Sequence, residues 1–177
     1  MPPTLVVQHS RSTELSPARA QSILKLCDAA YKTDTKSFFD LLGPADHLLG
    51  LADGELRSHL MWVTRWLQPA GEKALRTAYV EMVATAPDSQ RRGYASTLLR
   101  HFVPLVQDYD VAALCPATAS IYQRLGWTFW RGSLSARTDN GLLPTPDERV
   151  MLLPLTRTPH LDFDAALSIE WREGEIW

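Results

Sequence analysis

The sequence lacks the features of several large classes of protein. Its apolar runs are far shorter than the roughly 20 residues that a membrane-spanning helix needs. Residues 1–12 have neither the basic start nor the long apolar core of a secretion signal. The 18 Lys and Arg residues against 20 Asp and Glu residues give a net charge of −2, which argues against a general nucleic-acid binder. We therefore expect neither a membrane protein nor a nucleic-acid partner.

Cysteine and histidine are also scarce. Cys27 and Cys115 are the two cysteines, and both stand in apolar stretches of the sequence. So small a number suits a reducing compartment better than a disulfide framework. The five histidines have no metal-ligand spacing among themselves, so we interpret them as surface or structural residues. We expect a cytoplasmic protein without a metal site.

What is present is an ordinary globular composition. The chain has 177 residues, of which 45% are hydrophobic and 21% are charged, enough for one domain with a hydrophobic core. Strand-like segments alternate with segments whose apolar residues recur every three or four positions. This alternation predicts a single mixed α/β domain over residues 1–177. The expected elements are strands at 5–9, 75–85, 111–115, 127–130 and 150–153, a hairpin at 48–66, helices from Ser16-Pro17, within 32–46, at 95–106 and at 116–125, and a long loop at 132–149.

The stretch Tyr79–Arg100 joins a strand to a helix through a turn that is suited to phosphate. Its first half is apolar and β-branched, and its second half has helical periodicity. The turn between them reads Gln90–Ala95, and Gly93 within it lets the backbone approach a ligand closely. The first turn of a helix leaves N–H groups unpaired, and these favour phosphate together with Arg91 and Arg92.

Other phosphate-binding loops do not fit this turn. The Walker loop ends in Gly-Lys-Ser/Thr and the dinucleotide fingerprint needs three glycines, and the stretch has neither. The pattern Q-x-x-G-x-A after a strand instead resembles the acetyl-CoA-binding motif of the GCN5-related N-acetyltransferases (GNATs). The resemblance implies acetyl-CoA as cofactor and a central, mostly antiparallel twisted sheet of about six to seven strands with helices on both faces. The alternative is a capped helix with two solvated arginines. The implied cofactor contacts are Gln90, Arg91, Arg92, Gly93, Tyr94, Ala95 and Ser96.

A second motif, Ala119–Trp127, contains a candidate acid. In acetyltransferases of this type an equivalent x-x-x-Y-x-x-x-G-[WF] segment lies across the cofactor from the glycine turn, and Tyr122 stands where the family places the acid that protonates the departing thiolate. A phenol with a pKa of about 10 is protonated at neutral pH and can give its proton to a thiolate. The alternative is a helix tyrosine with a buried ring and a hydrated hydroxyl.

The strand before the turn contains a candidate base. Glu81 lies between apolar neighbours, and a carboxylate in a sheet core is costly unless it faces a cleft. It could take the proton of the attacking amine directly or through water, although an ion pair with Arg76 is the alternative. The family also places a bulge on this strand, so that backbone N–H groups face the thioester. The N–H groups implied by the resemblance are those of Met82, Val83 and Thr85.

The C-terminal segment, residues 160–177, is acidic and ends in aromatic residues. It holds five Asp and Glu residues against Arg172 and closes with E-W-R-E-G-E-I-W. Two tryptophans and an isoleucine favour docking over disorder. A docked acidic segment attracts a cation, whereas a helper strand or a dimer contact is the equal alternative. We expect this segment to pack near the substrate cleft.

Together with Tyr79-Val80-Glu81, the tail pattern W-R-x-G-[DE]-[VI]-W resembles the aminoglycoside 2'-N-acetyltransferases, most clearly over 79–131 and 144–177. The resemblance implies a small cationic aminoglycoside as substrate, acetylation of its 2'-amine and antibiotic resistance. Departures on the substrate side suggest a particular drug, with the kasugamycin-acetylating branch as one candidate. The implied substrate contacts are Asp34, Glu81, Cys115, either Asp147 or Glu148, and the carboxylate of Trp177.

Two other functions remain alternatives. A GNAT enzyme could instead acetylate a protein N-terminus, a lysine or another small amine, and the chain could also be a non-catalytic module that binds CoA or a drug. Trp62, Trp66 and Trp130 belong either to the core or to the contact face of a homodimer.

Overall fold

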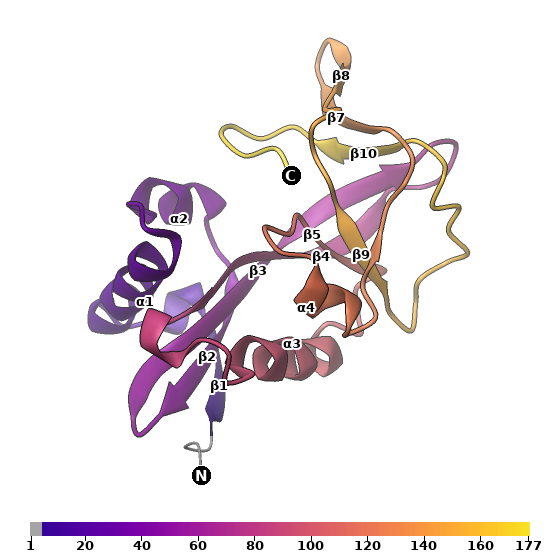
Figure 1. Cartoon of the computed structure of the whole chain (residues 1–177). Helices are drawn as coiled ribbons and strands as arrows, with labels where there is room; N and C mark the ends of the chain where they lie inside the picture. Colours follow the sequence, from indigo (N-terminus) through magenta and orange to yellow (C-terminus); the bar gives the residue numbers. More distant parts are fainter. Residues whose placement is uncertain (1–4) are drawn as a thin grey trace. The chain divides into compact units, whose positions relative to one another are not determined.

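The computed structural model describes residues 5–177 (Figure 1). Residues 1–4, which begin the stretch inspected for a secretion signal, lie outside the described residues. The chain forms two compact units. The first comprises the chain through Val63 together with Val80–Pro104, and the second comprises Thr64–Tyr79 together with Leu105–Trp177. Two long strands, β3 (Glu55–Pro69) and β4 (Leu75–Thr85), contribute to both units.

The first unit contains an antiparallel set of strands and most of the helical residues. Strand β2 pairs antiparallel with both β1 and β3. The elements before β3 are β1 (Val6–Arg11), the 3-10 helix η1 (Ser12–Glu14), α1 (Pro17–Tyr31), α2 (Lys36–Leu42) and β2 (Asp46–Ala52). A second 3-10 helix, η2 (Pro87–Ser89), and helix α3 (Tyr94–Leu105) follow β4.

Local sequence explains where several of these elements begin and end. Ser16 caps α1 by accepting a hydrogen bond from the amide of Arg19, and Pro17 occupies the first helical position. Asp53 and Gly54 have φ angles of 53° and 78°, the left-handed pair that a two-residue type I′ hairpin turn requires. The predicted helix start and the predicted hairpin are therefore confirmed.

The core of the first unit settles the place of one tryptophan. The rings of Trp62 and Phe102 meet edge to face, with their centroids 5.3 Å apart. Trp62 is 3% exposed and therefore belongs to the core. In the second unit Trp130 is also buried, whereas Trp66 is 45% exposed. Of the three tryptophans that could have formed a contact face, only Trp66 is available at the surface.

The second unit is built mainly from short strands. Strand β5 (Val111–Leu114) runs parallel to β4, and β9 (Met151–Pro154) pairs antiparallel with β5 and with β6 (Thr128–Phe129). The one-turn helix α4 (Ser120–Gln123) precedes β6. Strand β10 (Leu167–Glu170) pairs antiparallel with β3 and parallel with β7 (Leu134–Thr138), which forms a hairpin with β8 (Gly141–Pro144).

All ten described strands belong to one hydrogen-bonded sheet. Its order is β6-β9-β5-β4-β3-β10-β7-β8, with β2 and then β1 continuing from β3. The β4–β5 and β7–β10 pairs are parallel, so the sheet is mixed. The α/β class is confirmed, and β4 has the bounds that the sequence predicted. The sheet has more strands than expected because β7, β8 and β10 arise from the C-terminal part of the chain.

The expected long loop at 132–149 is wrong, because this segment forms the β7–β8 hairpin. Its turn contains Gly141 at a φ of 109°, and the hydroxyl of Thr138 donates to the Gly141 carbonyl at 2.8 Å. Turn residues dominate the composition of the segment, and each flanking strand is too short to show a clear alternation. The predicted strand at 150–153 is present but is followed by β10. The predicted helix at 116–125 shrinks to the four residues of α4, which stop before the left-handed Gly126.

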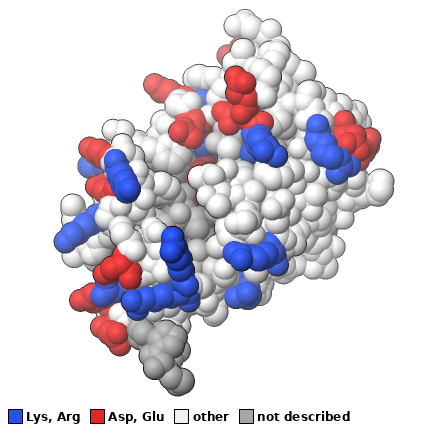
Figure 2. All heavy atoms as spheres, viewed as in Figure 1, with Lys and Arg blue, Asp and Glu red and all other residues white. Residues whose placement is uncertain are grey.

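Surface charge and cysteine environment complete the description. Basic and acidic side chains are interspersed on the face seen in Figure 2, so no single sign of charge dominates it. Among the described residues, no helix has the length and apolar character needed to cross a bilayer, and no group of three or more His, Cys, Asp or Glu residues is arranged to hold a metal. Cys27 is buried, whereas Cys115 is exposed rather than enclosed by apolar side chains.

Candidate active site

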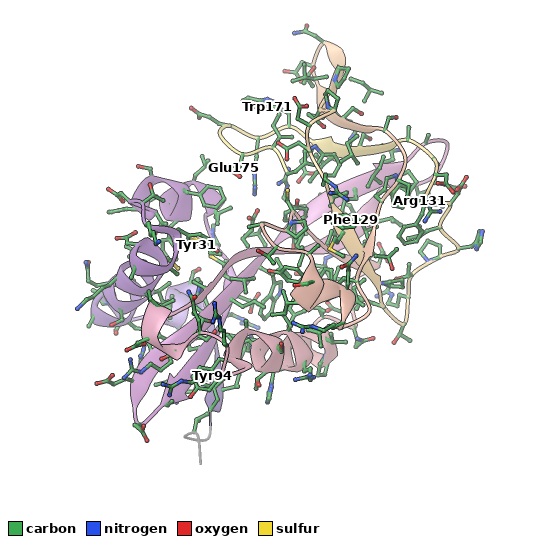
Figure 3. All side chains as sticks on the ribbon, in the orientation of Figure 1. Tyr31, Tyr94, Phe129, Arg131, Trp171 and Glu175 are labelled. Carbon is green, nitrogen blue, oxygen red and sulfur yellow. The ribbon has the colours of Figure 1, made fainter. Side chains whose placement is uncertain are left out.

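The turn before α3, in the first unit, has the backbone geometry of an anion-binding turn. Arg91 and Gly93 have φ angles of 63° and 81°, and such left-handed residues turn successive N–H groups toward one point. The carbonyl of Gly93 accepts the first helical hydrogen bond from the amide of Thr97 at 2.9 Å. The amides of residues 94–96 precede that bond, and within residues 5–177 they have no hydrogen-bond acceptor. Tyr94, the first residue of α3, is labelled in Figure 3.

Two side chains hold this turn in place, while a third remains available. The amide group of Gln90 donates to the Thr85 carbonyl at 3.3 Å, and the guanidinium of Arg92 donates to the Asp88 carbonyl at 3.3 Å. Arg91 is exposed and makes no hydrogen bond or ion pair with any described residue. A ligand phosphate would therefore meet free backbone donors and one free guanidinium.

Strand β4 has a left-handed residue at Met82, with a φ of 48°. A non-glycine residue in this region interrupts the regular alternation of a strand and is strained. Hydrogen bonds from side chains hold the carbonyl of Met82 and those of the next two residues in this conformation. The carbonyl of Met82 accepts from His59 Nδ1 at 3.0 Å, that of Val83 from the hydroxyl of Tyr31 at 2.8 Å, and that of Ala84 from the hydroxyl of Ser58 at 3.0 Å. The interruption falls on the strand where the resemblance to the family implies a bulge.

Glu81 precedes the left-handed residue and is half-buried between buried neighbours. Arg76, its alternative ion-pair partner, instead donates to Asp108 Oδ2 at 2.9 Å and lies over the ring of Tyr109 at 4.0 Å. The guanidinium that could have neutralised Glu81 is therefore engaged elsewhere in the second unit.

Tyr122 lies in α4 of the second unit and is 8% exposed. Its carbonyl accepts from the amides of Leu125 and Trp127 at 2.9 and 3.1 Å, which fixes the segment around the ring. The Trp127 ring contacts the Tyr122 ring edge to face at 6.0 Å. Burial raises the pKa of Tyr122 to about 12, so the hydroxyl keeps its proton throughout the neutral range.

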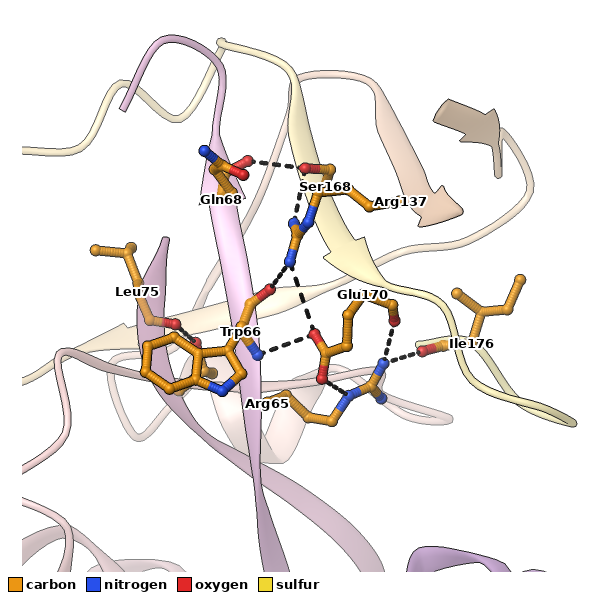
Figure 4. A network of polar contacts seen from close by, with 9 residues as sticks. Arg65, Trp66, Gln68, Leu75, Arg137, Ser168, Glu170 and Ile176 are labelled. Atoms are coloured by element: carbon orange, nitrogen blue, oxygen red, sulfur yellow. Dashed lines mark hydrogen bonds and ion pairs between the residues drawn. The ribbon is translucent and has the colours of Figure 1, made fainter. Parts of the chain in front are cut away.

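The tail is docked within the second unit through a polar network around Arg65 (Figure 4). Arg65 is 4% exposed, and its Nε donates to Glu170 Oε1 at 2.6 Å. Its Nη2 donates to the carbonyls of Glu170 and Ile176 at 2.8 and 3.0 Å. The indole N–H of Trp177 donates to the hydroxyl of Thr145 at 2.8 Å, and Trp177 is 2% exposed. The tail forms strand β10 within its own unit, which is the helper strand named as the alternative, and its packing near a substrate cleft stays a prediction.

The tail carries less free negative charge than its composition suggested. Glu170 pairs with Arg65 and lies 3.9 Å from Arg137, and Asp164 makes two bonds of 2.7 Å to Arg131. Such pairs leave little charge for a cationic ligand. Glu173 and Glu175 are exposed and remain available to attract a cation.

Of the other predicted substrate residues, the structure brings two together. Cys115 Sγ lies 3.6 Å from Glu148 Oε2, so these two residues are brought together in the second unit. Although the residue as a whole is exposed, desolvation of its thiol, followed by the nearby Glu148 carboxylate, raises the pKa of Cys115 to about 11. Asp147 is exposed. Asp34, in the first unit, is exposed and accepts a hydrogen bond from the amide of Lys36, so it helps to start α2.

Sequence reasoning missed a buried pair of histidines, His47 and His59, that contacts β4. Burial lowers the pKa of His47 to about 4, and burial together with the neighbouring His47 lowers that of His59 to about 3. An unfolded histidine has a pKa of about 6.5, so below that pH the unfolded chain binds more protons than the folded chain. The contribution of these histidines to the free energy of unfolding should therefore be at its maximum above about pH 6.5. It should fall as the pH drops toward about 3.

Denaturant titrations at a series of pH values between about 4.5 and 8 would measure this dependence. A His59→Leu variant should have a shallower slope than the wild type over the same range. Equal slopes in the two proteins would contradict the assignment of neutral, buried imidazoles.

Comparisons with known proteins agree with this geometry. A family model described as "Acetyltransferase (GNAT) domain" matches residues 13–130. An aminoglycoside 2'-N-acetyltransferase from Mycolicibacterium fortuitum is 31% identical over 131 residues, which are 70% of this chain and 67% of that protein.

Solved structures share the fold at lower identity. A GNAT family N-acetyltransferase (YhbS) from Escherichia coli in complex with CoA aligns with a TM-score of 0.65 at 15% identity, covering 94% of this chain and 89% of that one. Eis1 from Mycobacterium abscessus aligns with a TM-score of 0.58 at 22% identity over 73% of this chain. The chain spans only 32% of the length of Eis1, and about a third of several other matched structures. From the family match over most of its length, the chain belongs to the GNAT acetyltransferases, whose acetyl donor is acetyl-CoA.

Proposed function

We propose that the protein transfers the acetyl group of acetyl-CoA to a primary amine of an aminoglycoside, giving resistance to that drug. The observation that carries the substrate class is the 31% identity, over 131 residues, to an aminoglycoside 2'-N-acetyltransferase. Acetylation of the 2'-amine, and a kasugamycin-like drug as the acceptor, are the finer forms of the same proposal.

The proposed cofactor site is the turn Gln90–Ser96. The diphosphate of acetyl-CoA accepts hydrogen bonds from the amides at the start of α3, and the side chains of Arg91 and Arg92 add positive charge. The free amides of residues 94–96 and the left-handed Gly93 support this assignment.

The proposed reaction is a direct attack in a ternary complex. The neutral amine nitrogen forms a bond to the thioester carbonyl carbon, and the C–S bond breaks with its electron pair on sulfur. Glu81, directly or through water, takes the proton that the amine loses, and the Tyr122 hydroxyl gives a proton to the thiolate. The raised pKa of Tyr122 supports the second role, since the phenol remains neutral until the thiolate develops.

The amides of β4 are proposed to stabilise the negative charge that develops on the carbonyl oxygen. Met82, Val83 and Thr85 are the candidates, and fixed N–H dipoles lower the barrier because they need no reorganisation. The held carbonyl of Met82 supports Val83 in particular, because the C=O and N–H of one trans peptide point in opposite directions.

On the acceptor side we propose Glu148 rather than Asp147 as the acid beside Cys115, because Glu148 already lies within reach of that thiol. Asp34 and the carboxylate of Trp177 are proposed as further contacts with the drug amines. The exposed Glu173 and Glu175 would add long-range attraction for a cation.

A second acceptor class is favoured by one observation. Because arginines already neutralise Glu170 and Asp164, the tail offers less acidity than a polycationic drug would use. A small monoamine or a peptide amine would need fewer carboxylates.

The test is incubation of the protein with acetyl-CoA and a panel of aminoglycosides, kasugamycin and small amines, followed by mass spectrometry of the acceptors. We expect a gain of one acetyl group on at least one aminoglycoside, and a higher melting temperature for that drug in the presence of CoA. Acetylation of monoamines or peptides alone would favour the second class. If no drug in the panel is acetylated although CoA still binds, aminoglycosides are rejected as the acceptor class.

A further inference from the structure

A line of hydrogen bonds crosses the core of the first unit and ends at the strained residue of β4. The hydroxyl of Ser12 lies 2.9 Å from His47 Nε2, His47 Nδ1 lies 3.0 Å from His59 Nε2, and His59 Nδ1 lies 3.0 Å from the carbonyl oxygen of Met82. Both imidazoles are completely buried. A buried polar network of this kind favours one defined core structure only when every donor meets an acceptor.

Burial lowers the pKa of both histidines and keeps their rings neutral, and for neutral rings one order of donors and acceptors fits the contacts from Met82 to His47. The Met82 carbonyl can only accept, so His59 Nδ1 carries a hydrogen and its Nε2 is an acceptor. His47 Nδ1 must then donate to that Nε2, and the one hydroxyl hydrogen of Ser12 has two acceptors within reach, His47 Nε2 at 2.9 Å and the Ala45 carbonyl at 3.1 Å. The Ser12 oxygen in turn accepts from the amide of Ala45 at 2.9 Å. Both neutral rings then carry their hydrogen on Nδ1.

Cys27 does not convert this pair into a nucleophilic site. Its sulfur lies 3.8 Å from His59 Nδ1, the same nitrogen that already donates to Met82 at a much shorter distance. Burial raises the pKa of Cys27 to about 12, so the thiol is not ionised. At the His59 end of the line, the backbone group that is held is the peptide between Met82 and Val83.

The orientation of that peptide decides where the Val83 amide points. Because the peptide is trans and planar, holding its carbonyl toward His59 aims its N–H in the opposite direction. The left-handed φ of Met82 makes this orientation strained, so it persists only where surrounding contacts impose it. Tyr31 holds the next carbonyl, at Val83, in the same way.

We propose that His59, backed by His47, is a positioning residue for acetyl transfer, because it holds the Met82–Val83 peptide so that the Val83 amide can donate to the thioester oxygen. This inference rests on the proposed function for its chemical consequence, although the orientation of the peptide can be measured separately. His59 touches no reacting atom and acts through the backbone.

The test compares His59→Leu, which removes the donor, with His59→Asn, which keeps an N–H near the position of Nδ1. We expect His59→Leu to lower kcat roughly 10- to 100-fold with KM for acetyl-CoA changed less than about 3-fold, since one transition-state donor is displaced. His59→Asn should recover most of kcat. Leu60→Ala, a truncation of a fully buried neighbour on β3, controls for loss of stability alone and should leave kcat nearly unchanged.

NMR measurements of the Val83 amide test this inference independently of the proposed function. In the wild type, acetyl-CoA should shift the Val83 amide resonance, and both histidines should show the Nδ1–H tautomer. In His59→Leu the Val83 shift should be lost while cofactor-dependent shifts at residues 94–96 persist. If the wild type acetylates no acceptor, the proposed function fails but this shift still reports the positioning. A Val83 shift that is unchanged in His59→Leu, or a kcat equal to that of the wild type, would overturn the inference.

Discussion

Tyr122→Phe is expected to lower kcat by about 10²- to 10⁴-fold while acetyl-CoA affinity changes little. This is the range that a positioned general acid contributes, and the variant removes only the proton that the thiolate would receive. Because burial raises the pKa of Tyr122 to about 12, the wild-type rate should show no loss from deprotonation of this group below about pH 11. Glu81→Gln should cause a loss of the same order, because an amide cannot take the proton of the amine.

The measurement is the loss of thioester absorbance at saturating acetyl-CoA, which follows the reaction directly and needs no thiol reagent. Tyr109→Phe is the matched control, since Tyr109 is also 8% exposed and its hydroxyl bonds only Thr64 among the described residues. We expect that control to retain nearly full turnover. If Tyr122→Phe and Glu81→Gln both kept wild-type function, the non-catalytic binding module would be the better account.

Gly93→Ala is expected to weaken CoA binding by about 10- to 100-fold. Gly93 has a φ of 81°, a region that costs an L-residue about 1–2 kcal/mol. An added methyl group would meet no atom within 4 Å, so the strain is in the backbone and not in packing. Relief of that strain would turn the neighbouring amides away from the diphosphate.

Gly71→Ala is a matched control for this effect. Gly71 lies in the β3–β4 connection with a φ of 78°, and an added methyl group there also meets nothing within 4 Å. Calorimetric titration with CoA should show a similar affinity for wild type and Gly71→Ala and a much weaker one for Gly93→Ala. Equal weakening in both variants would mean that general destabilisation is responsible.

Elements with strong local signals were predicted well from the sequence. Ser16-Pro17 starts α1, Asp53-Gly54 turns the β2–β3 hairpin, and β4 has its predicted bounds, because each depends on neighbouring residues. Strands β7 and β8 were missed because they lie in a segment rich in turn residues, and β10 was missed because it pairs with β3 and β7, which are distant in sequence.

The candidate site divides along the same line. The glycine turn before a helix could be inferred from local pattern, whereas a bulge on β4 was implied only by the resemblance to the family. The histidines could not, because nothing in the residues around His47 and His59 shows that their rings meet in the core. The neutralisation of the tail charges could not be predicted either, because the pairing of Glu170 with Arg65 spans 105 residues of sequence.

The most direct measurement of the central claim is the behaviour of the Tyr94, Ala95 and Ser96 amide protons when CoA is added. If these amides hold the diphosphate, their NMR resonances should shift and their exchange with solvent should slow on saturation with CoA. Unchanged shifts and exchange at all three amides, in a sample whose other resonances show that CoA is bound, would contradict it.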